Sequence, residues 1–104
     1  MNKYDVYWAR YAFEDNPTNF KVRPVVILDP TSILILVIKV TSKPPRKNYN
    51  DYELVDWSAA GLKVKSTVRL DKQLKINSSD ILNYIGHLSN KDILAIEQIL
   101  KNVK

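Results

Sequence analysis

Cysteine is absent from the sequence, and histidine occurs only once, at His87. A chain without cysteine has no disulfide framework, no thiolate nucleophile and no thiolate ligand for a metal. A single histidine also makes a histidine-based metal site within one chain unexpected. We therefore expect no metal and no other cofactor, and the composition suits a reducing compartment such as the cytoplasm.

Long hydrophobic runs are missing as well. The two most apolar segments are residues 25–28 and 33–38, and the polar residues 29–32 separate them. Neither segment approaches the roughly 20 residues that a membrane-spanning helix needs. The N-terminal MNKYDVYWAR lacks the apolar core of a signal peptide. The sequence predicts one soluble, cytoplasmic domain over residues 1–104, a length that supports a single core.

The positive charge is concentrated in the middle of the sequence. The formal net charge is +5, and all of this excess falls within residues 39–75, because acids and bases balance in residues 1–38 and 76–104. A basic zone of this kind indicates a partner that carries phosphates, such as a nucleic acid. A solvated basic face would give the same pattern, so the charge alone leaves both interpretations open.

Apolar residues in alternating or continuous patterns predict five strands. We expect them at residues 4–8, 22–28, 33–40, 52–55 and 64–70. Residues 9–21 are polar and contain Pro17, so we expect a long loop there, and a second, basic loop at residues 42–48. The polar residues 71–79 are expected to lead out of the last strand. The strands predict a small, strongly bent sheet.

The C-terminal quarter changes to a helical period. Ser79 is expected to cap a short helix that stops before Gly86, which would leave His87 at the surface. Ser89 and Asp92 resemble a capping box at the start of a second helix. The apolar stripe of that helix is expected to pack on the core, or else to form a dimer surface; it contains Ile93, Ile96, Ile99, Leu100 and Val103. The expected fold class is therefore α+β, mainly β, with C-terminal helices.

Arg23 and Pro24 stand directly in front of the apolar run at residues 25–28. An arginine at a strand end can simply keep its charged head in water. However, the turn at residues 29–32 predicts a hairpin in which Arg23 lies near Ile38, at the same open end as Thr41 and Ser42. Because side chains alternate, a slip of one residue decides which of the two hydroxyls shares the face of Arg23.

A second polar set follows the alternation of the last predicted strand. Val68 and Leu70 are expected to point one way, and Thr67, Arg69 and Asp71 the other. Such an arginine and carboxylate can form an ordinary surface ion pair, worth at most about 1 kcal/mol. They can also bind a phosphate through the arginine while the carboxylate accepts a proton.

Four short motifs resemble, in their order and approximate spacing, the MazF/PemK toxins of type II toxin-antitoxin systems. The motifs are VRPVVIL at 22–28, VTS at 40–42, GLKVKSTVRLDK at 61–72 and IGHLS at 85–89. The resemblance extends over nearly the whole chain. It implies an SH3-like barrel, usually a homodimer, that cleaves single-stranded RNA without a metal and is inhibited by a cognate antitoxin protein.

The same resemblance implies two pairs of catalytic residues. In MazF-like members the arginine of the Arg-Pro motif and a later threonine carry catalysis, and here these are Arg23 and Thr41. In PemK-like members an Arg-x-Asp motif carries it, which corresponds to Arg69 and Asp71. Both pairs are present, and which one acts stays open. Residues 14–21 depart from the family pattern, which keeps as alternatives a non-catalytic SH3-like module that binds nucleic acid or peptide, or a purely structural dimerising domain.

Basic, aromatic and hydroxyl side chains near these pairs are expected to contact the RNA. They are Ser42, Lys43, Arg46, Lys47, Tyr49, Lys65 and Ser66. Metal-free cleavage needs a base for the 2′-hydroxyl proton, a cation at the phosphate and an acid for the leaving 5′-oxygen. Asp71 is the expected base. Arg23 and Arg69 are the expected cations because a guanidinium stays protonated, and Thr41 is expected to hold a phosphate oxygen. The expected product is a 2′,3′-cyclic phosphate.

Overall fold

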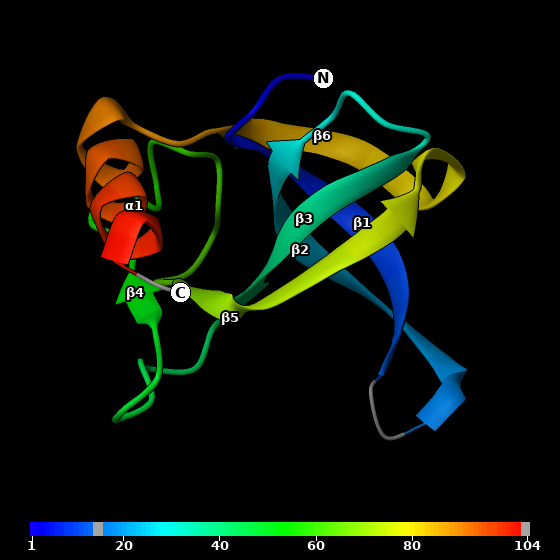
Figure 1. Cartoon of the computed structure of the whole chain (residues 1–104), viewed down its shortest axis with the longest axis horizontal. Helices are drawn as coiled ribbons and strands as arrows, with labels where there is room; N and C mark the ends of the chain where they lie inside the picture. The colour runs from blue at the N-terminus through cyan, green and yellow to red at the C-terminus, as the bar shows by residue number, and fades with distance from the viewer. Residues whose placement is uncertain (14–15, 103–104) are drawn as a thin grey trace.

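The computed structural model describes residues 1–13 and 16–102. In this part of the chain, one sheet of six strands is followed by one α-helix (Figure 1). The elements are β1 (Asp5–Phe13), β2 (Asn16–Asp29), β3 (Leu34–Thr41), β4 (Asp51–Glu53), β5 (Thr67–Asn77), the 3-10 turn η1 (Ser78–Asp80), β6 (Ile81–His87) and α1 (Asn90–Asn102). The mainly β, α+β class is confirmed, with six strands instead of about five and one α-helix instead of two.

The sheet is antiparallel and strongly bent. Its strand order is β4-β5-β3-β2-β1-β6. The end strands β4 and β6 do not pair with each other in the described part of the chain, so the sheet stays open where a closed barrel was expected. Figure 1 shows α1 beside β4, on the opposite side of the molecule from the β1–β2 hairpin. No helix among the described residues is long and apolar enough to cross a membrane.

The predicted β2–β3 hairpin is confirmed, with a different register. The Asp29 carboxylate accepts hydrogen bonds from both the backbone N–H and the hydroxyl of Thr31, which fixes the turn. Val26, rather than Arg23, lies opposite Ile38, and Val25 lies opposite Lys39. Arg23 therefore lies beyond the last paired residue of β2, at the end of the hairpin where β3 ends at Thr41.

The long loop predicted at residues 9–21 is wrong. Strand β1 continues to Phe13 and β2 begins at Asn16, with Tyr11 opposite Lys21. The inward positions of this segment are the small Ala9 and the aromatic Tyr11, both buried, while Arg10 between them is exposed. This alternation makes an otherwise polar segment a strand. Residues 14 and 15 of the predicted loop lie outside the described residues.

Two further predictions in the C-terminal half are wrong. Strand β5 does not end near Leu70 but continues to Asn77, because Ile76 and its neighbours cover the second apolar cluster. The helix expected after Ser79 is only the turn η1, and β6 follows it. The spacing of apolar residues in 81–85 also fits a short helix. The segment is a strand because it pairs with β1 in the sheet.

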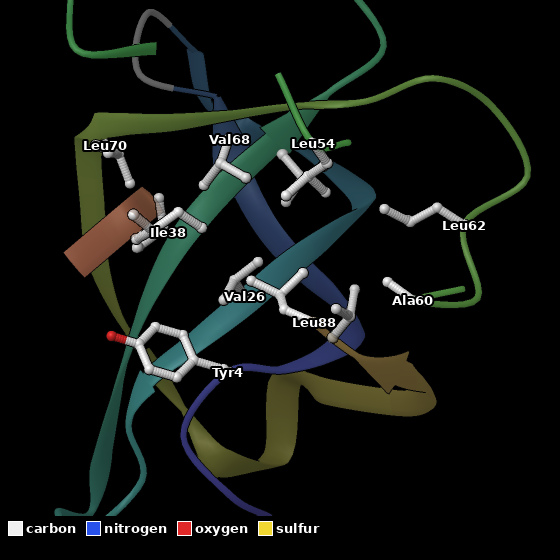
Figure 2. Packing of buried hydrophobic residues seen from close by; sticks show 12 residues of the cluster. Tyr4, Val26, Ile38, Leu54, Ala60, Leu62, Val68, Leu70 and Leu88 are labelled. Carbon is white, nitrogen blue, oxygen red and sulfur yellow. The ribbon is translucent and has the colours of Figure 1, made fainter. Parts of the chain in front are cut away.

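The sheet buries an apolar cluster on each face. One cluster lies between the sheet, the segment before β5 and α1, and Figure 2 shows its side chains converging from strands and loops far apart in the sequence. The other is centred on Val25, Ile27 and Val37. The stripe of α1 packs on the first cluster, with Ile96 fully buried, so its predicted core role is confirmed. Val103, the last residue of the predicted stripe, lies outside the described residues.

Candidate functional site

A pocket of about 580 Å³ lies at the open end of the β2–β3 hairpin. Strands β1, β2, β3 and β6 and the segment before β5 form its walls. The lining residues are Trp8, Val22, Arg23, Pro24, Val40, Thr41, Ser42, Lys43, Gly61, Leu62, Lys63, Val64, Ser66, Tyr84 and Ile85. This lining contains two lysines and one arginine but no carboxylate, so its electrostatics favour an anionic ligand.

The predicted proximity of Arg23 to Thr41 and Ser42 is confirmed, because all three residues line this pocket. The Arg23 side chain is exposed, and its Nη1 donates to the Val22 carbonyl at 3.1 Å. The Thr41 hydroxyl oxygen accepts a hydrogen bond from the Lys43 backbone N–H at 3.2 Å, which orients both residues at the pocket. No other hydrogen bond from the Arg23 guanidinium to a described residue is present, so within this part of the chain its remaining donors are available to a ligand.

Other predicted RNA contacts divide between the pocket and the rest of the surface. Ser66 lines the pocket, but its hydroxyl already donates to the Val64 carbonyl at 2.8 Å. Lys65 lies outside the lining and pairs with Glu53 at 3.9 Å, an exposed ion pair. Lys47 is exposed on the basic loop, away from the pocket lining. Of the seven predicted contacts, Ser42, Lys43 and Ser66 are the ones that the pocket brings together.

The Arg46 side chain forms hydrogen bonds with other side chains of the protein. Its Nε donates to Asp51 Oδ2 at 2.9 Å, its Nη2 to Asp51 Oδ1 at 2.9 Å, and its backbone N–H to Asp51 Oδ2 at 2.8 Å. The Asp51 side chain is 0% exposed. Hydrogen bonds from Arg46 hold the pKa of the Asp51 carboxyl below its usual range. Tyr49 stacks on the guanidinium, with 4.1 Å between the guanidinium carbon and the ring centre. Arg46 therefore anchors the basic loop.

Asp71 belongs to the same network. Arg46 Nη2 donates to Asp71 Oδ1 at 2.7 Å, and neither Arg69 nor Asp71 is a lining residue of the pocket. The Asp71 carboxylate is thus engaged with a neighbouring side chain and not with the pocket. The structure thus separates the two predicted pairs: Arg23 and Thr41 line the pocket, while Asp71 supports the loop beside it.

Arg69 lies near Tyr11, close enough for its charge to act on the tyrosine hydroxyl. The Tyr11 side chain is buried, which raises the pKa of its hydroxyl, and the positive charges of Arg23 and Arg69 partly oppose that rise. Lys39 lies opposite Arg69 in the sheet, and its Nζ is 5.1 Å from the centre of the Tyr11 ring. The Arg69 Nε is buried without a hydrogen-bond partner. The charges of both candidate arginines therefore reach the same tyrosine.

Helix α1 is hydrogen-bonded to the segment before β5, which forms one wall of the pocket. Ser89 caps the helix by accepting a hydrogen bond from the Asp92 N–H at 3.2 Å. The Asp92 carboxylate is fully buried and accepts from the Tyr52 hydroxyl at 2.7 Å and from the backbone N–H groups of Val55 and Asp56 at 3.0 and 2.9 Å. Burial and this hydrogen bond raise the pKa of the Tyr52 hydroxyl. Asp92 thus ties the segment before β5 to the helix.

The same wall touches β6 at two glycines. A Cβ on Gly86 would lie 2.1 Å from the Ala60 carbonyl oxygen, and one on Gly61 would lie 2.4 Å from the Ile85 carbonyl oxygen. Gly61 also has φ +92°, a conformation that favours glycine. Gly86 therefore allows close backbone approach and does not stop a helix. Beside it, His87 Nδ1 is 2.8 Å from Asp5 Oδ1, away from the pocket.

Sequence reasoning missed several residues of the site. Trp8 and Tyr84 contribute aromatic rings to the pocket, and Lys63 a charge. The sequence analysis predicted a strand at residues 4–8 without assigning Trp8 to a site, and it predicted a helix where β6 lies, so neither ring was assigned to a site. Among the described residues, no group of three or more acidic or histidine side chains is placed to hold a metal.

Comparison with known proteins gives consistent results. A sequence model of the PemK-like, MazF-like toxins of type II toxin-antitoxin systems matches residues 2–103. No curated protein sequence matches the chain. An endoribonuclease in complex with its cognate antitoxin from a mycobacterial species has a similar structure, with a TM-score of 0.76 at 11% identity, covering 98% of this chain and 92% of that one. The Mycobacterium tuberculosis toxin MazF-mt6 gives a TM-score of 0.70 at 22% identity, covering 92% and 93%.

Proposed function

This chain belongs to the PemK-like, MazF-like toxin family of type II toxin-antitoxin systems, and we propose that it is an endoribonuclease toxin that cuts single-stranded RNA. The observation that carries the proposal is the pocket in which Arg23, Thr41 and Ser42 meet two lysines and no carboxylate. Such a site attracts a phosphodiester and supplies an arginine to it. The family match and the shared fold support the same activity.

In the proposed mechanism the RNA 2′-oxygen attacks the adjacent phosphorus, and the bond from phosphorus to the 5′-oxygen breaks. The products are a 2′,3′-cyclic phosphate and a free 5′-hydroxyl. Arg23 stabilises the negative charge that builds up on the phosphate, and Thr41 donates a hydrogen bond to one of its oxygens. Because Asp71 pairs with Arg46, we assign the proton transfers to water at the open pocket rather than to Asp71. The contribution of the protein is then mainly electrostatic.

Cleavage of a single-stranded RNA by the purified protein in the presence of EDTA tests the proposal. Removal of one well-placed donor to a developing oxyanion lowers a rate by roughly 100- to 1,000-fold, so we expect Arg23→Ala to fall in this range. Ile33→Ala is the control, because Ile33 is 85% exposed and lies at the hairpin turn, outside the pocket lining. Intact RNA after incubation with the folded wild-type protein would contradict the proposal.

A non-catalytic RNA-binding module is the second candidate. The pairing of Asp71 with Arg46 favours it, because this pairing withdraws the one carboxylate that the Arg-x-Asp motif offers for proton transfer. This candidate predicts RNA binding that weakens steeply with salt and no turnover. The cleavage assay above separates the two candidates directly.

We further propose that the protein is a homodimer in the cytoplasm and that a cognate antitoxin protein inhibits it. The support is family membership, and one structural relative is described in complex with its antitoxin. Light scattering after size exclusion would measure the mass of the assembly against the 12.0 kDa of one chain. A monomer at every concentration that cleaves RNA would contradict the dimer.

A further inference from the structure

The departing 5′-oxygen is the part of the proposed reaction for which no side chain has been assigned. It leaves as an alkoxide, a strong base, so a proton supplied as the bond breaks speeds the step. The pocket lining contains neither a carboxylate nor a histidine, the side chains that most often carry such protons. A side-chain proton donor at this pocket must therefore be of another kind.

Four lining residues carry a proton on a nitrogen or a phenol: Arg23, Lys43, Lys63 and Tyr84. A guanidinium does not release its proton in proteins, so Arg23 supplies charge and not a proton. A lysine ammonium is protonated at neutral pH and can release its proton, and lysines serve in acid–base catalysis. Tyr84 belongs to β6 and Lys63 to the segment before β5, whereas Lys43 follows Thr41 by two residues. Lys43 is therefore the donor nearest in the chain to the hydroxyl group proposed to hold the phosphate.

The backbone fixes Lys43 beside that hydroxyl group. The Lys43 N–H donates to Thr41 Oγ1 at 3.2 Å. This bond uses a lone pair of the hydroxyl oxygen and leaves its hydrogen for a ligand. Pro44 and Pro45 follow directly, and a proline restricts both its own backbone and that of the residue before it. The Lys43 backbone is thus constrained on both sides before RNA binds.

The Lys43 ammonium is not engaged within the part of the chain that the structure describes. The residue is exposed, and no hydrogen bond or ion pair joins its Nζ to a described residue. Lys65, by contrast, has its Nζ 3.9 Å from Glu53 Oε1. The Lys43 ammonium is therefore available to a substrate, and the residue belongs to the same lining as Arg23 and Thr41.

We infer that Lys43 is the proton donor to the leaving 5′-oxygen, an inference that rests on the proposed function. As the 2′-oxygen bonds to phosphorus, the electron pair of the bond from phosphorus to the 5′-oxygen moves onto that oxygen. A proton passes to it from the Lys43 ammonium, directly or through one water. The 2′-hydroxyl proton goes to water, and the neutral Lys43 amine recovers a proton from solvent. Arg23 stabilises the charge on the phosphate throughout.

An RNA with sulfur in place of one 5′-oxygen tests this assignment. A thiolate is a much weaker base than an alkoxide, so it departs without a proton. We expect Lys43→Met to cut ordinary RNA about 100- to 10,000-fold more slowly, the usual contribution of a general acid, and to cut the sulfur-containing RNA at nearly the wild-type rate. Lys91→Met is the control, because it removes the same charge from an exposed position on α1, outside the lining. It should cut both RNAs like wild type.

Two further variants separate proton transfer from charge. Lys43→Arg keeps the positive charge but does not release a proton, so it should be as slow as Lys43→Met on ordinary RNA and recover with the sulfur-containing RNA. Arg23→Ala should lose activity on both RNAs, because the phosphate carries the same charge in each. If Lys43→Arg cuts ordinary RNA as fast as wild type, or if sulfur does not rescue Lys43→Met, Lys43 acts through its charge alone and the inference is overturned.

The other proton carriers of the lining provide a competing outcome. Lys63→Met and Tyr84→Phe are expected to show no rescue by sulfur. If either variant, and not Lys43→Met, is slow on ordinary RNA and recovers with the sulfur-containing RNA, that residue is the donor and the inference is wrong.

Failure of the inference is distinguishable from failure of the proposed function. If wild type cuts ordinary RNA, Arg23→Ala does not, and Lys43→Met keeps the wild-type rate, Lys43 is not the donor and the nuclease proposal stands. If the folded wild-type protein leaves both RNAs intact, the nuclease proposal is wrong and the inference is wrong with it. Circular dichroism confirms that each variant is folded before the rates are compared.

Discussion

Asp71 provides the sharpest test of how this site works, because its two interpretations predict opposite results for one substitution. As a general base, Asp71 would be essential for cleavage. As a partner of Arg46, it would help to hold the basic loop, and Asp71→Asn would have little effect on the reaction. The Arg46–Asp71 distance of 2.7 Å supports the second interpretation.

The magnitudes follow from burial. The Arg46 and Asp71 side chains are 27% and 29% exposed, so loss of their pair in Asp71→Asn should lower the free energy of unfolding by about 0.5–1 kcal/mol. Arg46→Gln instead leaves the Asp51 carboxylate, which is 0% exposed, without its guanidinium. Breaking a buried pair in this way costs about 2–4 kcal/mol. Arg46→Lys should lie between them, because it keeps the charge and loses the two-pronged contact.

Urea unfolding and RNA cleavage at pH 7 measure both effects. We expect Asp71→Asn to cleave within about threefold of wild type, an effect below 1 kcal/mol. Asp71→Asn protein that is as stable as wild type but cleaves 100-fold more slowly would refute the reasoning and make Asp71 the base. Unfolding in acid is a second check. Arg46 lowers the pKa of Asp51, so the stabilisation that the Arg46–Asp51 pair gives is present at neutral pH and is lost as the pH falls below about 4. Arg46→Gln should weaken that acid dependence.

Three other predictions concern the frame around the pocket. Asp92→Ala removes the acceptor of three hydrogen bonds from a fully buried site and should lower the free energy of unfolding by about 3–5 kcal/mol, measured with urea. Gly86→Ala puts a Cβ 2.1 Å from the Ala60 carbonyl oxygen, so thermal unfolding should show a loss of about 2 kcal/mol or more, whereas Ala at exposed Ser58 should be neutral. Burial and Glu97 raise the pKa of Tyr4 to about 12. The free energy of unfolding should therefore fall by up to about 2–3 kcal/mol as the pH rises from about 10 to 12. Tyr4→Phe should reduce this fall.

The parts of the fold that local chemistry determines could be predicted from the sequence. The turn sequence at Asp29-Pro30 predicted the β2–β3 hairpin, because the side-chain hydrogen bonds of this turn join neighbouring residues. Ser89 predicted the start of α1 for the same reason, because it caps the helix through the nearby Asp92 N–H. These signals lie within a few residues of one another, and no distant contact is needed to read them.

The elements that were missed depend on distant partners. Strand β6 has mostly exposed residues and is a strand because it pairs with β1, about 75 residues away in the sequence. Arg46 and Asp71 are 25 residues apart, so their ion pair appears only once the loop and β5 are placed. The pocket combines segments from five regions of the chain, and for that reason its aromatic wall was not visible in any single motif.

The separation of the two candidate pairs also limits what Arg69 can do. Arg23 lines the pocket, whereas Arg69 is not among the lining residues and its Nε is buried. Both charges still act on Tyr11, so Arg69 influences the potential at this end of the sheet without touching the ligand. In the proposed reaction Arg23 would stabilise the phosphate directly, and the charge of Arg69 would act only through space, an effect that added salt should weaken. Both arginine motifs can therefore be present in one chain although only Arg23 lines the pocket.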